Sequence, residues 1–399
     1  MTLIRPLAAA LLLASAVPAA ADTDPAEWPA VEAAAEGQTV YWHAWGGSTA
    51  TNDFIAWVGE KAAEQGVTLE HVKLADTADA VGAVATERQA GRDTDGSVDL
   101  IWINGANFAS MKERDLLFGP FAEQLPNWQY VDTTKTVLTD FTVPTEGYES
   151  PWAMAQVVMI HDAARVDAPP RTPEALLAWT KENPGRFTYP QPPDFLGTTF
   201  LKQMLIGLVE DPGVLQEAVG DDYEEVAAPL WRFLDEMTPN LWRRGQAYPA
   251  TGPQQLQLIN DGEVDLAVSF SPGEATTAIE NFQLPETVRT YVFDGGTLGN
   301  ASFVAIPYNS SAKEGAMVVA NILLSPEAQL RAQRPDILGY GTVLDMAKLP
   351  EEAREAFAAL ELGVATLSPE ELGPALPEPH PTWAERLAED WVARYGVSD

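Results

Sequence analysis

The chain has 399 residues, and its 24 lysines and arginines stand against 58 aspartates and glutamates, which leaves a formal net charge of −34. This charge makes nucleic acid and anionic membrane surfaces poor partners, and the absence of cysteine excludes disulfide scaffolds, thiolate metal sites and cysteine nucleophiles. With 46% hydrophobic residues the chain can bury a core, and its length suits two domains or one large bilobal unit.

The N-terminus has the pattern of a secretory signal. Arg5 lies in a short basic segment, residues 7–17 form an apolar run, and residues 19–21 are alanines of the size that signal peptidase requires. The apolar run is about half the roughly 20 residues that a membrane span needs. We therefore predict a signal peptide at residues 1–21 that is cleaved, and a mature protein in the periplasm without direct membrane insertion.

Strand and helix patterns alternate along the mature chain, which predicts an α/β fold. Runs rich in β-branched and aromatic residues are typical of strands, and amphipathic stretches are typical of helices. The predicted strands are 38–45, 68–73, 98–103, 186–189, 264–269, 288–293 and 302–307. Helices are predicted to begin near 51–53 and to cover 76–90, 312–324 and 383–395, with a proline-rich connector at 374–381.

Helix starts are marked by short capping patterns. Residues 311–314, Ser-Ala-Lys-Glu, fit a capping box. Three Ser/Thr-Pro-Glu triplets offer a hydroxyl cap, a proline that the first helical turn tolerates and a glutamate that favours the positive helix end. The triplets are 172–174, 325–327 and 368–370.

No residue pattern typical of catalysis or metal binding is complete. The four histidines, His43, His71, His161 and His380, form no helical ligand pair and are interpreted as structural. The segment 93–98 fails as a calcium loop, and the Ser-x-x-Lys spacing at 310–313 lacks its companion motifs. We predict no catalytic residue, no metal and no cofactor, although paired carboxylates stay possible in so acidic a chain.

Several segments together resemble the solute-binding proteins of bacterial ABC importers, and among them the YnjB-like branch. They include Trp-His-Ala-Trp-Gly-Gly-Ser at 42–48, Gly-Ser-Val-Asp-Leu-Ile-Trp-Ile-Asn-Gly-Ala-Asn-Phe at 96–108, and the segments 115–120, 189–197, 296–300 and 323–329. The likeness extends from about residue 37 to 334. It implies a type II periplasmic-binding-protein fold, in which two α/β lobes joined by a hinge close around a ligand in the cleft between them.

The resemblance also implies a division of the chain and a function. Lobe one is expected at 37–151 plus 303–335, lobe two at 152–302, and the C-terminal helices of 336–399 beside lobe two. Two crossing segments, beginning near 152 and returning near 302, would join the lobes. We expect a monomeric receptor that captures a small solute, performs no chemistry and delivers the solute to a membrane permease powered by a separate ATPase.

The ligand is expected at loops that follow the predicted strands, because ligands of open α/β sheets collect at strand C-terminal ends and helix N-termini. The candidate residues are Trp45, Gly47, Ser48, Asn104, Asn107, Phe108, Glu149, Trp152, Tyr189, Phe195, Gly197, Thr198, Ser269, Ser271 and Asn300. For the aromatic residues among them the alternative is core packing, and for the serines it is helix capping.

The composition of these loops constrains the charge of the solute. The loops contain several carboxylates and aromatic rings but neither lysine nor arginine, although receptors for anions usually recruit arginine. The loops are 45–53, 104–108, 148–156, 189–199, 246–253, 269–277 and 294–302. We predict a cationic or neutral organic solute, such as a thiamine-like compound or a polyamine, with a sugar as the next choice.

Two other functions compete with the receptor hypothesis. A secreted acidic hydrolase would use two paired carboxylates. A scaffold protein would keep only a vestigial cleft. Turnover of a metabolite by the purified protein would separate the hydrolase from the receptor.

Overall fold

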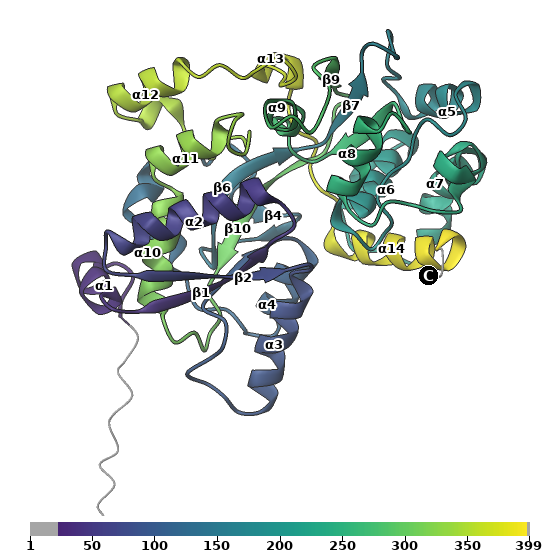
Figure 1. Cartoon of the computed structure of the whole chain (residues 1–399). Coiled ribbons are helices and arrows are strands. Elements are labelled where there is room, and N and C mark those ends of the chain that lie inside the picture. The colour runs from purple at the N-terminus through teal and green to yellow at the C-terminus, as the bar shows by residue number, and fades with distance from the viewer. Residues whose placement is uncertain (1–22, 397–399) are drawn as a thin grey trace, which may run out of the picture.

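The structure is a computed structural model that describes residues 23–396, so the predicted signal peptide lies outside the described residues. It has two lobes side by side, each built on its own β-sheet (Figure 1). Lobe one holds a five-stranded sheet of β2 (Thr68–Leu74), β1 (Thr39–Trp45), β3 (Leu100–Ile103), β10 (Gly299–Ala305) and β6 (Glu149–Gln156), in that order. Lobe two holds a three-stranded sheet of β8 (Leu266–Ser269), β7 (Val158–Asp162) and β9 (Val288–Tyr291).

Helices cover both faces of the lobe-one sheet, because successive side chains of a strand point to opposite faces. On β1, Val40, Trp42 and Ala44 pack into the core that includes α1, α2 and α10, whereas Ile101 and Ile103 of β3 pack toward α3 and α4. The strand β3 is parallel to β1 and antiparallel to β10. The helices of this lobe are α1 (Trp28–Ala35), α2 (Thr49–Ala63), α3 (Ala78–Gln89), α4 (Ala106–Glu113), α10 (Lys313–Leu323) and α11 (Pro326–Gln333).

Lobe two has its core between the sheet and two helices that are distant in the sequence. Phe200 and Met204 of α6 (Phe195–Leu208) share one buried cluster with Trp383 and Trp391 of the last helix, α14 (Pro381–Tyr395). In Figure 1, α14 lies beneath α6. The other helices of this lobe are α5 (Pro173–Glu182), α7 (Tyr223–Met237), α8 (Gly252–Asn260) and α9 (Glu274–Glu280).

Smaller elements complete the chain. The strands β4 (Thr139–Asp140) and β5 (Val143–Pro144) form a short hairpin in lobe one, and two further helices, α12 (Glu351–Ala358) and α13 (Pro369–Leu372), precede the C-terminal connector. Short 3₁₀ helices cover Ala122–Gln124, Pro126–Tyr130, Pro212–Gln216, Thr238–Asn240, Trp242–Gly245 and Met346–Lys348. Within residues 23–396, no helix combines the length and apolarity needed to cross a bilayer.

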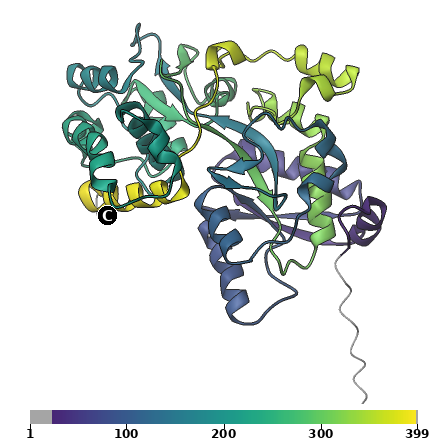
Figure 2. The same ribbon diagram turned by 180° about the vertical axis from the view of Figure 1, so that it is seen from behind.

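The chain crosses between the lobes three times rather than the expected two. The strand β6 of the first sheet continues within two residues into β7 of the second, and β10 returns the chain to lobe one. The third crossing begins after α12 and reaches lobe two at Ala365, which is buried against residues of β7 and β8. Its last part, the connector 373–380, leads from α13 to α14 along the junction of the lobes in both views (Figure 1, Figure 2).

The expected placement of residues 336–399 beside lobe two is wrong for its first part. Leu338, Val343 and Leu344 are buried in the lobe-one core, and Phe357 of α12 packs against the same core. The later part of this segment packs on lobe two: Ala365 is buried against α9 and the lobe-two sheet, and Leu376 and α14 pack on the α6 side of this lobe. The packing of the apolar side chains decides which lobe each part of this segment covers, because the local sequence pattern of a helix does not specify its partner.

Most of the predicted elements are present, and their differences have local causes. Residues 186–189 do not form a strand: Phe187 makes one isolated bridge to Leu266, and prolines at 190, 192 and 193 stop further pairing because proline has no backbone N–H. The predicted capping box at 311–314 is also wrong, since α10 begins after Ala312 without a side-chain cap and Ser311 Oγ donates to Asp99 Oδ1.

The three Ser/Thr-Pro-Glu triplets were correctly predicted as helix starts. Thr172 Oγ1 accepts the N–H of Ala175, and Ser325 Oγ accepts the N–H of Ala328. At the third triplet Ser368 Oγ accepts the N–H of Glu371. These caps satisfy backbone donors that the first turn of a helix leaves unpaired.

Candidate functional site

The lobes meet where Lys202 of α6 lies beside Phe141, which occupies the turn between β4 and β5. The Lys202 ammonium is 4.4 Å from the centroid of the Phe141 ring and 5.8 Å from that of Phe195. Phe195, at the start of α6, is 48% exposed and makes an edge-on contact with Phe270, with ring centroids 5.4 Å apart. Side chains from both lobes therefore form one aromatic cluster around a lysine.

The lysine is paired with a carboxylate from the third crossing. Lys202 Nζ lies 2.6 Å from Glu378 Oε2, and both side chains are almost completely buried. Asn300 of β10 donates its Nδ2–H to the other carboxylate oxygen, Glu378 Oε1, at 3.1 Å. The interlobe junction thus contains a buried ion pair that joins α6, β10 and the connector 373–380.

Two buried carboxyl groups lie in lobe one next to this junction. Asp140 Oδ2 accepts the backbone N–H of Gly105, the residue that precedes α4. Burial raises the pKa of Asp140 to about 8, although the Gly105 N–H opposes this. Burial and the nearby Asp140 also raise the pKa of Glu149 well above its usual range, and neither oxygen of Glu149 has a hydrogen-bond partner among the described residues.

A tyrosine links the far side of the junction. Tyr340 follows α11 in lobe one, and both the Thr51 side chain and Glu274 of lobe two are close enough to act on the pKa of its hydroxyl. Burial raises the pKa of Tyr340 to about 12. Ser269 Oγ donates to the Glu274 carboxylate, so β8 and the start of α9 are held together at this place.

Several predicted ligand residues lie on this interlobe side. Phe195 is described above; Ser269 and Ser271 lie at the end of β8, and Thr198 lies inside α6. The hydroxyl oxygens of Thr198 and Ser271 are buried and have no hydrogen-bond partner within residues 23–396. Asp194, rather than Thr198, caps α6, because its carboxylate accepts the N–H groups of Leu196 and Gly197.

The first predicted loop is ordered by packing and capping. Ser48 Oγ is the cap of α2 and accepts the N–H of Thr51 at 3.4 Å. A Cβ at Gly47 would lie 2.4 Å from the Trp45 indole, so only glycine lets the ring fold over this turn. Trp45 itself is partly exposed at the end of β1.

Other predicted residues serve the core or the junction. Phe108 is buried between α3, α4 and the sheet, Trp152 is buried among Phe54, Trp42 and Trp102, and Tyr189 is buried under α14. A ligand does not reach these three rings in this conformation, so the alternative of core packing describes them.

The remaining predicted residues make backbone or junction contacts. Asn104 Nδ2 donates to the Ala301 carbonyl at 2.6 Å, and Asn107 lies partly exposed in the first turn of α4. At Gly197 a Cβ would lie 2.2 Å from the Pro190 carbonyl oxygen, so this glycine allows α6 to approach the preceding loop. Asn300 binds Glu378, as described above.

Sequence reasoning did not identify Lys202, Glu378, Asp140 or Phe141. One signal was available: Lys202 is the single charged residue in α6, a helix whose other residues are apolar or small and polar. Such a lysine is expected to find a buried partner, because an unpaired charge in a core is costly. The partner, 176 positions later, had no sequence signal.

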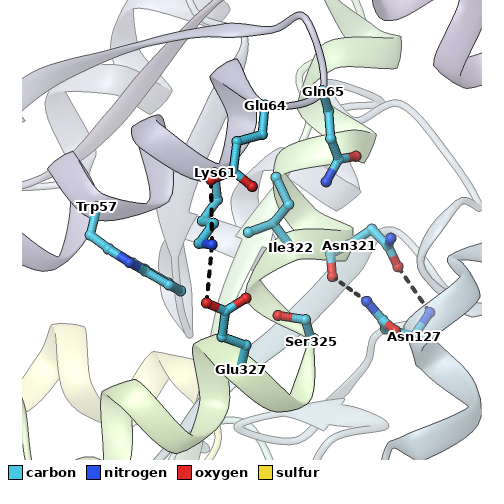
Figure 3. A pocket seen from close by; sticks show the side chains of 9 residues that line it. All are labelled: Trp57, Lys61, Glu64, Gln65, Asn127, Asn321, Ile322, Ser325 and Glu327. Atoms are coloured by element: carbon cyan, nitrogen blue, oxygen red, sulfur yellow. Dashed lines mark hydrogen bonds and ion pairs between the residues drawn. The ribbon is translucent and has the colours of Figure 1, made fainter.

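One hollow lies away from this junction, and a second borders it at Gln203, Leu376 and Pro377. The first, of about 150 Å³, lies on lobe one between Trp57, Lys61, Asn127 and Glu327 (Figure 3). Its polar groups pair with one another: Lys61 Nζ is 3.1 Å from Glu327 Oε1, and Asn127 donates two hydrogen bonds to Asn321, from its backbone N–H and its Nδ2. The other, of about 440 Å³, lies on lobe two beside α5 and α6. No predicted ligand residue lines either hollow.

Comparison with known proteins relates the chain to bacterial extracellular solute-binding proteins. The model of the family described as bacterial extracellular solute-binding protein matches residues 56–359. The protein YnjB of Escherichia coli (strain K12) is 46% identical over 377 residues, which cover 94% of this chain and 95% of that protein.

Solved structures match the fold at low sequence identity. The periplasmic binding protein AfuA from Actinobacillus pleuropneumoniae, with exogenous fructose-6-phosphate bound, has a TM-score of 0.63 at 12% identity, over 90% of this chain and 99% of that one. The spermidine/putrescine substrate-binding protein PotD from Streptococcus pneumoniae has a TM-score of 0.59 at 17% identity, over 90% of this chain and 98% of that one. The ferric binding protein from Campylobacter jejuni has a TM-score of 0.62 at 14% identity, over 90% of this chain and 100% of that one. These matches bear out the two-lobed type II periplasmic-binding-protein fold.

Proposed function

The chain belongs to the bacterial extracellular solute-binding proteins, and from this premise we propose that it is a periplasmic receptor for an ABC importer. It captures one small solute between its lobes as a monomer and delivers it to a permease driven by a separate ATPase. It catalyses no reaction. The observation that carries the proposal is the interlobe junction, where aromatic rings from both lobes surround Lys202. Thr198, whose buried hydroxyl has no partner among the described residues, lies on the same helix as this lysine.

The proposed solute is a small cationic or neutral organic molecule. The lysine at the junction, Lys202, is already matched by Glu378, so it offers no free positive charge to an anionic solute. The Phe195 and Phe270 rings offer faces to an organic cation, at roughly 0.5–2 kcal/mol for each contact. The unpaired hydroxyls of Thr198 and Ser271 suit the polar groups of an amine or a sugar.

A thermal-shift panel at fixed ionic strength tests the solute class. The purified protein is heated with amines, thiamine-like compounds, sugars, phosphate and dicarboxylates. A ligand at about 100 times its dissociation constant stabilises the folded state by about 2.7 kcal/mol, which raises the midpoint measurably. The largest rise is expected from an amine or a sugar; a largest rise from phosphate or a dicarboxylate would reject the proposed solute class.

A matched pair of variants ties the binding to the junction. Phe195→Ala is expected to weaken binding of the panel's best ligand about threefold to tenfold, the equivalent of one lost aromatic contact. The control is Phe282→Ala, which removes a ring that is 94% exposed after α9. Equal affinity of both variants and the wild type would remove the junction as the binding site.

The rival function, an acidic hydrolase, rests on one specific observation. Asp140 and Glu149 are neighbouring buried carboxyl groups with raised pKa values, as a catalytic pair would be. Incubation with the metabolite panel followed by mass spectrometry measures turnover. Unchanged ligand supports the receptor, whereas turnover that Glu149→Gln abolishes would establish the hydrolase in its place.

A further inference from the structure

The connector 373–380 behaves as a third strand of the hinge. Leu376 pairs with Leu298 in a parallel bridge, its N–H donates to the Thr297 carbonyl at 2.8 Å, and its carbonyl accepts the N–H of Gly299 at 3.0 Å. From the other crossing, Gln156 Nε2 donates to the Leu372 carbonyl at 3.2 Å. The connector and the end of α13 are therefore held against the other two crossings, and this fixes the place of Glu378, two residues after Leu376.

Glu378 directs both carboxylate oxygens into the interlobe junction. One oxygen binds the Lys202 ammonium at 2.6 Å and the other accepts from Asn300 at 3.1 Å, while the side chain is only 1% exposed. Charge-assisted hydrogen bonds of this length are the strong ones in proteins. Both oxygens are engaged, so Glu378 acts as a fixed counter-charge for Lys202.

The ammonium of Lys202 faces the place where the lobes separate. Phe141, which covers it at 4.4 Å, belongs to lobe one, whereas Lys202 belongs to lobe two. Hinge opening moves Phe141 away from Lys202 and uncovers the ammonium. Without Glu378 that ammonium would lose the carboxylate that it contacts and would keep only the electrostatic influence of the buried Asp140. A positive charge without a partner in contact attracts an anion.

We infer that Glu378 determines the charge specificity of the interlobe site: by neutralising Lys202 it excludes anionic solutes and leaves the site to cations and neutral molecules. The inference rests on the proposed interlobe binding of a solute. It assigns a specificity-determining role to the C-terminal connector, which otherwise only links α13 to α14.

The test measures anion binding by three proteins. Thermal midpoints of the wild type, Glu378→Gln and the double variant Lys202→Gln/Glu378→Gln are recorded with inorganic phosphate or succinate at fixed ionic strength. Glutamine keeps the shape and the hydrogen bond to Asn300 but removes the charge. We expect both anions to raise the midpoint of Glu378→Gln, with at least tenfold tighter binding than to the wild type, and to leave the double variant unmoved.

A second measurement keeps the inference testable if Glu378→Gln does not fold. Lys202→Gln leaves the Glu378 carboxylate unmatched, so putrescine, as a cationic probe, is expected to bind this variant at least tenfold more tightly than the wild type. A folded Glu378→Gln that binds no anion overturns the inference. So does a double variant that binds anions as tightly as the single one, or a Lys202→Gln variant without a gain for putrescine.

The outcomes separate this inference from the proposed function. If the wild type binds an anion best, the neutralising role of Glu378 is overturned while a solute receptor remains. If the wild type binds no organic solute but Glu378→Gln gains anion binding that the double variant lacks, the proposed function fails and the role of Glu378 stands.

Discussion

The buried carboxyl Asp140 leads to a prediction about stability and pH. The group is fully buried, one oxygen accepts the Gly105 N–H, and the other has no hydrogen-bond partner among the described residues. Burial raises its pKa from 3.8 to about 8. The folded protein therefore keeps a proton that the unfolded chain has already lost at neutral pH.

The direction and size of the effect follow from this difference. A carboxyl whose pKa is raised on folding contributes stability that is fully present below the unfolded pKa of 3.8 and is lost as the pH rises toward about 8. The loss is about 1.4 kcal/mol for each pH unit, or at most about 3 kcal/mol between about pH 5.5 and pH 8. Relaxation of the folded protein around the charge lowers this, and we expect about 1–2 kcal/mol.

The variant Asp140→Asn removes the titration but keeps an oxygen for the Gly105 N–H. Urea unfolding followed by tryptophan fluorescence, at about pH 5.5, 7 and 8, is expected to show that its advantage over the wild type grows with pH by that amount. Asp53→Asn, on the exposed face of α2, is the control because it makes the same chemical change at a carboxyl group that folding does not bury. A difference between Asp140→Asn and the wild type that is constant across this pH range, or equal to that of the control, would refute the reasoning.

Three further predictions concern the candidate site, the core and the surface. Trp45→Ala and Asn104→Ala are each expected to weaken solute binding without lowering the unfolding midpoint by much; wild-type affinity in both, measured by calorimetry, would remove this loop pair from the site. Trp391→Ala is expected to lower the free energy of unfolding in urea by about 3–5 kcal/mol, because it empties a fully buried site and removes the 2.9 Å hydrogen bond to Tyr189 Oη. A decrease below about 1 kcal/mol would contradict this expectation. The unfolding midpoint is expected to be higher in about 1 M salt than in about 0.01 M salt, because the Debye length falls from about 30 to about 3 Å and the salt then screens the net charge of −34. A midpoint that does not change with salt would speak against self-repulsion.

The sequence alone was enough for the features that depend on neighbouring residues. Runs rich in β-branched and aromatic residues located β1 and β3 within a few residues, because such side chains favour strands. An amphipathic stretch located α10, because a helix needs its apolar face at a fixed period. The triplets at 172–174 and 325–327 located two helix starts, since a hydroxyl cap acts on an N–H only three residues later. The family resemblance then supplied the two-lobed arrangement.

The tertiary structure alone decided which distant groups meet. Nothing local links Lys202 to Glu378, or Asp140 to Gly105, because these contacts depend on how helices and loops pack and not on the chemistry of adjacent residues. The same holds for residues 337–358, whose apolar side chains would fit either lobe by pattern but pack on lobe one. Hydrophobic burial is non-directional, so the sequence specifies that an apolar face is covered. Only the assembled fold specifies which element covers it.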